Sequence, residues 1–521
     1  MIDRHIRRTK FHFSIGVILL FATLITGIAT LKGIPYLSYD YLVKQVSYLR
    51  YRSLFGDTKI FYSESSGSHA ESVPVLVYHG LVDGLSKDES QAGEGVNMSP
   101  DQFWNQMLAL KRDGWNTISI YDFHDFMMGK KELPEKSFLL TFDDGRKDSY
   151  YPADPILNAL GFHATMFVIT ERSLDLRKSS FYLSEPELKE MVRSGRWDIQ
   201  SHGFLDHDVY TINPQGDKGH FLGNKLWKDT EKRFETDEEF KLRVLDDLTS
   251  SKNQIEQDLG VRVLGFAYPF SDYGDQDSNF SDAKNIVPKI TESIYPLSFY
   301  QVSSSNGFGF NYPLERSEDL KSLMIKRIKF PNPLTGVDIV RYLSISLQKP
   351  LPYNDTFIEN RGWYASWGEV SIENGILSVG ARDSTSGGAV FLDGSSGWKD
   401  YTFMVTPSRI DGESVTLLAH YIDDNNLLEC TYTDKFARIV WMASGERKLF
   451  QEVKVQEPLS KNQRLGVRVA GGNAQCLIDD VVVISGSEEG HERGVVGVKT
   501  WDPVLGKSRA YISGVYVEKE K

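Results

Sequence analysis

Two clusters of polar residues have the types and spacing that metal-assisted hydrolysis requires. Asp143 and Asp144 are adjacent and precede Gly145, and His202 and His207 lie five positions apart. Two imidazoles and one carboxylate form a common catalytic zinc set with a coordination position left open for water. Neighbouring residues on an extended strand point in opposite directions, so one aspartate can bind a cation while the other faces a substrate. The alternatives are a solvated Asx turn for the aspartates and a chance pair for the histidines.

A third stretch, Gly265–Tyr273, has no titratable group that looks catalytic. By itself it predicts a strand followed by a turn. It can also form the wall of a substrate groove, with Tyr268, Pro269, Phe270 and Tyr273 as its lining and a backbone N–H as an oxyanion donor.

These three stretches lie in a segment where short apolar runs alternate with helical patterns. Strands are expected at 73–80, 138–142, 164–169, 197–200 and 264–268, and helices after the N-cap Ser99 and at 154–160, 185–194 and 238–259. Such alternation indicates an α/β fold with a mostly parallel sheet or barrel. In these folds chemistry lies at the carboxyl ends of the strands. All three stretches follow a predicted strand, so we expect them to meet at one edge.

The order and spacing of the motifs resemble the polysaccharide deacetylases, carbohydrate esterases that share the NodB homology domain. The family motif Thr-Phe-Asp-Asp-Gly is matched without change at 141–145, Ser-His followed by His at 201–207, and aromatic-Pro-aromatic at 268–270. The resemblance covers about half of the chain, from Val73 to Leu347, and implies a (β/α) barrel-like domain. It also implies roles for five residues: Asp144, His202 and His207 as ligands of a divalent metal (zinc before nickel, cobalt or iron), Asp143 as the base, and the Phe270 N–H as oxyanion donor.

Within this family the chain looks similar to the exported poly-N-acetylglucosamine N-deacetylases of bacterial biofilms. They share the five-residue step between the histidines and an insertion after the second one, which is Ile212–Phe240 here. The resemblance therefore implies a hydrolase that removes N-acetyl groups from such a polysaccharide. The alternatives are an O-acetyl esterase acting on xylan-like or capsular chains and a catalytically impaired glycan-binding protein.

The chain departs from the family at the residue that protonates the leaving amine. The family has a late Leu-x-His motif, whereas no histidine occurs here between His220 and His420. Protonated Asp143, His79 and His220 are the candidates, although a structural role is the usual one for such histidines.

A second departure concerns the arginine that steadies the catalytic aspartate in many members of the family. Leu264 and Gly265 occupy its neighbourhood, and Arg262 comes too early. Arg327, in an apolar strand expected at 323–330, is a candidate, and a solvated charge is the alternative.

After Pro350 the pattern changes to alternating strands without helices, which predicts an antiparallel sandwich. Its features resemble the concanavalin-like (laminin-G-like) jelly rolls, which implies glycan binding. The aromatic residues considered for sugar stacking, with core packing as the alternative, are Trp363, Trp367, Trp398, Tyr421 and Trp501. The two cysteines, Cys430 and Cys476, fall in this part, either paired or separately buried.

The N-terminus predicts a membrane anchor. Basic residues precede Phe11–Leu31, a run of 21 residues without Asp, Glu, Lys or Arg, which is about the 20 needed to cross a bilayer. The basic flank is expected in the cytoplasm, with a cleaved signal peptide and a core helix as alternatives. The expected domains are 1–32 flank and anchor, 33–72 stalk and linker, 73–350 deacetylase domain and 351–521 sandwich.

The composition limits the partners. The net charge is −12, which disfavours nucleic-acid binding, and two cysteines cannot form a disulfide scaffold for 521 residues. We expect a polysaccharide substrate, attachment to the membrane through the N-terminal helix, and both folded domains outside the cytoplasm. The sequence allows no inference about a protein partner.

Overall fold

The structure is a computed structural model of the chain. It describes residues 46, 49, 69–82, 97–174, 181–276, 278–303, 309–313, 323–330, 334–443, 445–455, 463–487 and 493–520. The chain divides into two compact units, the first within 1–301 and 313–340 and the second within 302–312 and 341–521. Each unit is described by itself below.

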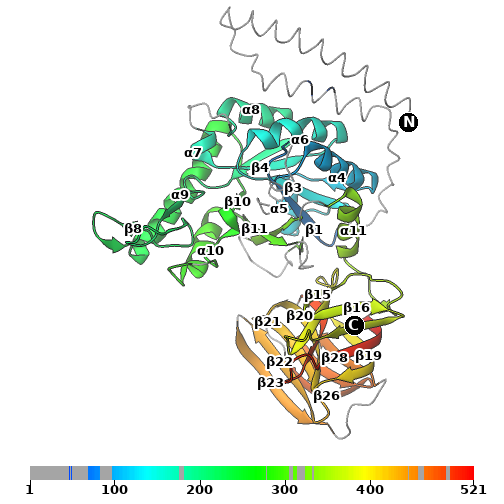
Figure 1. The fold of residues 1–521 in the computed structure, drawn as a ribbon. Coiled ribbons are helices and arrows are strands. Elements are labelled where there is room, and N and C mark those ends of the chain that lie inside the picture. Colours follow the sequence, from blue (N-terminus) through cyan, green and yellow to red (C-terminus); the bar gives the residue numbers. More distant parts are fainter. Residues whose placement is uncertain are drawn as a thin grey trace, which may run out of the picture. The chain divides into compact units, whose positions relative to one another are not determined.

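The first unit is built on a closed parallel barrel (Figure 1). Its seven strands are β1 (Val73–Tyr78), β3 (Ser137–Phe142), β4 (Ala164–Val168), β5 (Trp197–Ser201), β10 (Gly265–Ala267), β11 (Leu297–Ser303) and β13 (Leu323–Lys329). They follow the order β1-β13-β11-β10-β5-β4-β3, and a parallel pairing of β3 with β1 closes the ring. The short β2 (Asn116–Thr117) pairs with β3. The predicted α/β barrel is thereby confirmed.

Strands β1, β3, β4, β5 and β10 are buried along their whole length. Continuous burial is typical of parallel strands covered by helices. The helices are α4 (Pro100–Arg112), α5 (Ile120–Met127), α6 (Lys147–Leu160), α7 (Thr170–Ser173), α8 (Glu185–Ser194), α9 (Asp237–Leu259), α10 (Ala283–Ile294) and α11 (Gly336–Ser346), with a 3₁₀ turn η1 (Pro269–Ser271). In Figure 1, α4, α6 and α8 lie outside the strands.

Helix starts follow local chemistry. Ser99 caps α4 through a capping box with Gln102, as the N-cap prediction required. Helix α6 begins seven residues before the predicted start at 154, and it contains Pro152 and Pro155. Proline usually interrupts a helix, so the sequence pattern predicted a later start than the structure shows.

The segment after the second histidine forms two small hairpins. They are β6 (Val209–Thr211) with β7 (Lys218–His220), and β8 (Trp227–Lys228) with β9 (Arg233–Phe234). The hairpins connect β5 to α9 and bring His220 to the end of a strand.

The second unit contains two antiparallel sheets. One sheet has the order β16-β17-β28-β19-β24-β25-β26 with β14 on β28, and the other has the order β15-β18-β27-β20-β21-β22-β23. The strands of these two sheets are β14 (Tyr353–Asp355), β15 (Trp363–Trp367), β16 (Glu369–Glu373), β17 (Ile376–Gly380), β18 (Gly387–Leu392), β19 (Tyr401–Asp411), β20 (Ser414–Asp423), β21 (Asn426–Tyr432), β22 (Phe436–Ala443), β23 (Glu446–Lys454), β24 (Leu465–Ala470), β25 (Asn473–Ile478), β26 (Val481–Ser487), β27 (Val495–Trp501) and β28 (Arg509–Lys519).

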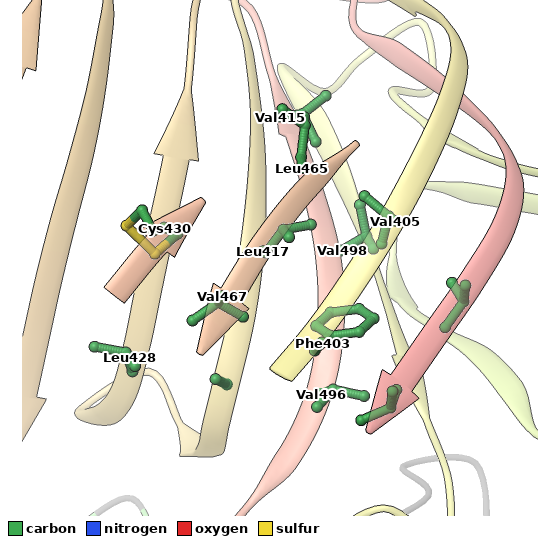
Figure 2. Close-up of a cluster of buried hydrophobic side chains, with 14 of the residues drawn as sticks. Phe403, Val405, Val415, Leu417, Leu428, Cys430, Leu465, Val467, Val496 and Val498 are labelled. Atoms are coloured by element: carbon green, nitrogen blue, oxygen red, sulfur yellow. A yellow bond between two sulfur atoms is a disulfide. The ribbon is translucent and has the colours of Figure 1, made fainter. Parts of the chain in front are cut away.

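Side chains from both sheets form one core (Figure 2). Phe403 and Val467 come from one sheet, and Leu417 and Val498 come from the other. Cys430 of β21 and Cys476 of β25 form a disulfide between the sheets, and both are fully buried. The pairing that the sequence left open is therefore present.

The tryptophans of the second unit divide into two groups. Trp363 and Trp398 are buried in the core, so the stacking considered for them is wrong, whereas Trp367 and Trp501 are exposed. The predicted membrane segment Phe11–Leu31 lies outside the described residues. Among the residues that the structure describes, no helix is long and apolar enough to span a bilayer.

Candidate active site

The two aspartates leave strand β3 in different directions. The N–H of Asp143 donates to the carbonyl of Tyr78 at 3.2 Å, which continues the pairing of β3 with β1. Asp144 then takes a left-handed conformation with φ 71°, which aspartate tolerates better than most residues. The chain turns at this point, and the two carboxylates acquire separate environments.

Asp144, His202 and His207 come together as predicted. Asp144 Oδ1 lies 3.1 Å from His207 Nε2 and 3.5 Å from His202 Nε2. The three ligand atoms are all within 4.8 Å of one another. Two imidazole nitrogens and one carboxylate oxygen at this spacing fit a divalent cation such as zinc and leave a coordination position open.

The second nitrogen of His202 supports this interpretation. Its Nδ1 lies 2.7 Å from the carbonyl oxygen of Ala267 in β10. A carbonyl oxygen can only accept a hydrogen bond, so His202 Nδ1 must carry the proton. His202 Nε2 is then unprotonated and presents its lone pair toward Asp144. Although burial raises the pKa of Asp144, the neighbouring His202 and His207 outweigh this effect and hold the pKa well below the usual value.

The loop between the two histidines is anchored by helix α9. Asp247 accepts hydrogen bonds from the N–H groups of Phe204 and Leu205 at 3.0 and 2.7 Å. Gly203 has φ 81°, and a Cβ there would lie 1.7 Å from the Asp206 carboxylate, so this turn requires glycine. Burial and the neighbouring Asp247 raise the pKa of Asp206 well above its usual value.

Asp143 is held by the arginine whose place in the site was open. Arg327 of β13 is fully buried and donates to both carboxylate oxygens of Asp143 at 2.5 and 2.8 Å. Burial raises the pKa of Asp143, but the charges of Arg327, His202 and His79 outweigh it and lower the pKa overall. Arg262 is exposed at the surface. The candidate Arg327 thus fills the position that Arg262 cannot.

His79 follows β1 and lies on the other side of the same carboxylate. Its Nε2 is 3.7 Å from Asp143 Oδ2, and burial lowers its pKa. His79 therefore contacts the candidate base and belongs to the site.

The third motif contributes one exposed side chain. Phe270 has φ 57° and is 41% exposed, and its ring lies 4.8 Å from that of His207. Tyr268 has no exposed surface and Pro269 is buried. The prediction that Tyr268 and Pro269 line a groove is therefore wrong. Tyr268, which precedes η1, packs in the apolar core, and within this turn only the Phe270 side chain is exposed to solvent. Tyr273 is partly buried.

His220 lies beside Phe270. The two rings stack with centroids 4.3 Å apart and planes 5° apart. His220 Nδ1 is 2.7 Å from Asp272 Oδ2, and Asp272 is almost fully buried. The sequence named His220 as a candidate but did not select Asp272 or Asp247. Asp272 could have been selected because it lies three residues after Pro269 of the third motif. Asp247 could have been selected because it is an acidic residue among the apolar positions of α9.

Comparison with known proteins agrees with this geometry. A model of the polysaccharide deacetylase family matches residues 130–284, which include both aspartates and both histidines of the metal-type cluster. This part of the chain is therefore similar to the polysaccharide deacetylase domain.

Three relatives illustrate the similarity. The chain is 29% identical over 154 residues to YxkH of Bacillus subtilis strain 168, a provisionally named polysaccharide deacetylase, covering 29% of this chain and 50% of that protein. It is 25% identical over 181 residues to the poly-beta-1,6-N-acetyl-D-glucosamine N-deacetylase of Staphylococcus aureus strain MSSA476, covering 34% and 54%. The enzyme of the same name from Escherichia coli strain K12 is 22% identical over 197 residues, covering 36% and 29%. The chain thus spans about half the length of the first two relatives and less of the third.

Proposed function

We propose that this protein is a metal-dependent hydrolase that removes N-acetyl groups from an extracellular polysaccharide of the poly-N-acetylglucosamine type. One observation carries the proposal: the cluster of Asp144, His202 and His207 lies beside a second carboxylate, Asp143, that Arg327 holds in place. The similarity to two N-deacetylases of this polysaccharide supports the substrate class.

The two aspartates suit different tasks. A divalent cation held by Asp144, His202 and His207 would lower the pKa of a water molecule and polarise an acyl carbonyl. Asp143 is the group that accepts a proton from the attacking water, because its two hydrogen bonds with Arg327 keep it ionised and oriented. The Phe270 N–H is assigned, by the family resemblance, to the developing oxyanion.

The disulfide supports a location outside the cytoplasm. Disulfides persist in oxidising compartments and are rare in the cytosol, and Cys430 and Cys476 are paired. We include in the proposal the N-terminal anchor and glycan binding by the sandwich, which the exposed Trp367 and Trp501 make chemically reasonable.

The test is acetate release from N-acetylglucosamine oligomers by metal-free protein before and after a divalent metal is restored. We expect activity only with metal, and a loss of about 10²-fold or more in Asp143→Asn, since a general base supplies about that factor. The matched control is Asp125→Asn, an exposed aspartate on α5. No acetate release with metal restored would refute the proposal, and release from O-acetylated xylan alone would identify an O-acetyl esterase instead.

A further inference from the structure

The site lacks the late histidine that protonates the leaving amine elsewhere in the family, yet it holds a histidine in a prepared environment. His220 ends strand β7 in the insertion, and its Nδ1 lies 2.7 Å from Asp272 Oδ2. The other oxygen of Asp272 accepts the N–H of Gly274 at 2.8 Å. Asp272 is 1% exposed, and a buried carboxylate that accepts from a ring N–H fixes the tautomer and orientation of the ring.

The backbone around this pair leaves no spare room. A Cβ on Gly223 would lie 2.8 Å from Asp272 Oδ2, so the turn between β7 and β8 requires a glycine where it passes the carboxylate. The Asn224 side chain donates to the His220 carbonyl at 3.2 Å. Both halves of His220, its ring and its backbone, are therefore positioned by specific contacts.

The His220 side chain is only partly buried. It is 31% exposed, and its Nδ1 is bonded to Asp272, so Nε2 is the nitrogen left for proton exchange. The Phe270 ring contacts both His220, at 4.3 Å, and His207, at 4.8 Å. The distance between the His220 and His207 rings therefore cannot exceed the sum of these two centroid distances.

The two other candidate donors are placed differently. His79 Nε2 is 3.7 Å from Asp143 Oδ2, which directs any proton on that nitrogen to the base. Asp143 accepts hydrogen bonds from Arg327 on both oxygens, which favours its ionised form. The Nδ1 of His220 is bonded to Asp272, which leaves Nε2 as the second nitrogen able to carry a proton.

We propose that His220 is the general acid of this enzyme and that Asp272 is its positioning residue, an assignment that rests on the function proposed above. Asp143 takes a proton from water as the hydroxide oxygen bonds to the acetyl carbon. The C–N bond then breaks, its electron pair stays on nitrogen, and His220 Nε2 gives that nitrogen a proton. Acetate and a free sugar amine leave, after which Asp143 loses a proton to solvent and His220 regains one.

The test compares two leaving groups in the metal-loaded enzyme. Sugar amines need a proton to leave, whereas the phenolate of an activated aryl acetate does not. We expect His220→Gln to lower kcat on N-acetylglucosamine oligomers by about 10²- to 10⁴-fold and to leave aryl acetate hydrolysis unchanged. Asp272→Asn should show a smaller loss with the same selectivity, and free imidazole should restore part of the oligomer activity of His220→Ala.

The other outcomes overturn the assignment in distinguishable ways. Equal loss on both substrates would mean a structural role for His220, and full oligomer activity in His220→Gln would remove it from the reaction. Selective loss in His79→Gln instead would make His79 the donor. A wild-type protein that released no acetate from the oligomers would refute the proposed function and this assignment with it.

Discussion

At the scale of single residues, the site depends on one buried ion pair. Asp143 and Arg327 are both buried, and two hydrogen bonds join the carboxylate to the guanidinium. Charges of this kind are retained inside a protein only when each one is compensated by its partner. The pair links the carboxyl end of β3 to the middle of β13, so it also sets the direction in which the base points.

We predict that Arg327→Met lowers kcat far more than it changes KM. The remaining carboxylate would be buried without the guanidinium that compensates its charge, which costs about 3–5 kcal/mol and favours its protonated form, so the base is lost. Steady-state kinetics on N-acetylglucosamine oligomers should show about the same loss in Arg327→Met as in Asp143→Asn.

The control for this prediction is Arg262→Met, which removes an exposed arginine from the loop between α9 and β10. This variant should leave kcat unchanged. In the double variant Asp143→Asn with Arg327→Met we expect no further loss, because residues that act as one unit are not additive. Independent, multiplying losses would contradict the ion pair as the unit of action.

The sequence predicted the ligand cluster at this scale because the residues with chemistry follow strand ends. Asp143, Asp144, His202 and His207 are each reached by a short buried strand, so the fold class alone brings them to one edge. Arg327 was ambiguous, since it lies 184 residues from Asp143 and only the closure of the barrel places β13 beside β1. The burial of Tyr268 was missed because the three-residue strand before it is too short for alternating hydrophobicity to show which side chains face the core.

At the scale of elements, helix α9 is more than a cover for the barrel. Its Asp247 is 5% exposed and holds the loop between the two histidines through two backbone N–H groups. Burial raises the pKa of Asp247 to about 6. The helix therefore supports the site with a carboxyl group whose charge is disfavoured in the folded state.

This shift predicts a pH dependence of stability. The folded state keeps the Asp247 proton up to about pH 6, whereas the unfolded chain releases it near pH 4. Folded protein thus binds more protons in this window, and the free energy of unfolding falls as pH rises from about 4 to about 6. In Asp247→Asn that contribution disappears, so urea unfolding of metal-free protein should show the variant gaining on the wild type with rising pH, by at most about 3 kcal/mol.

The neighbouring Asp246, which is exposed, provides the matched control. Asp246→Asn removes an exposed carboxylate from the same helix and should follow the wild-type pH profile. If the Asp247→Asn and wild-type profiles ran parallel between pH 4 and 6, Asp247 would not be the titrating group.

At the scale of the whole molecule, the two compact units are expected to be stabilised in different ways, one by a bound metal and the other by a disulfide. The first unit contains the ligand cluster of Asp144, His202 and His207, and the second contains the disulfide between its two sheets. The sequence separated these parts because helical patterns end where alternating strands begin. It could not decide the disulfide, since the sheet pairing that brings β21 and β25 together is not encoded in the spacing of the cysteines.

Two perturbations should therefore act on two different thermal transitions. A divalent metal that binds the folded first unit stabilises it by about 2.7 kcal/mol at 100 times its dissociation constant, and Asp144→Asn should abolish this shift. Replacing both cysteines by alanine should lower the stability of the sandwich by about 2–4 kcal/mol, because the link closes a long loop in the unfolded chain. Calorimetry of the full chain, with and without metal, measures both effects.

The decisive comparison is the metal-dependent shift in the cysteine variant. If metal binding belongs to the barrel alone, the shift persists at its full size when the sandwich is weakened, since the ligand cluster belongs to the first unit and both cysteines belong to the second. Loss of the metal shift together with the disulfide would show that the barrel cannot hold its metal-binding geometry without an intact sandwich. In that case the second unit would be part of the catalytic machinery rather than a separate glycan-binding module.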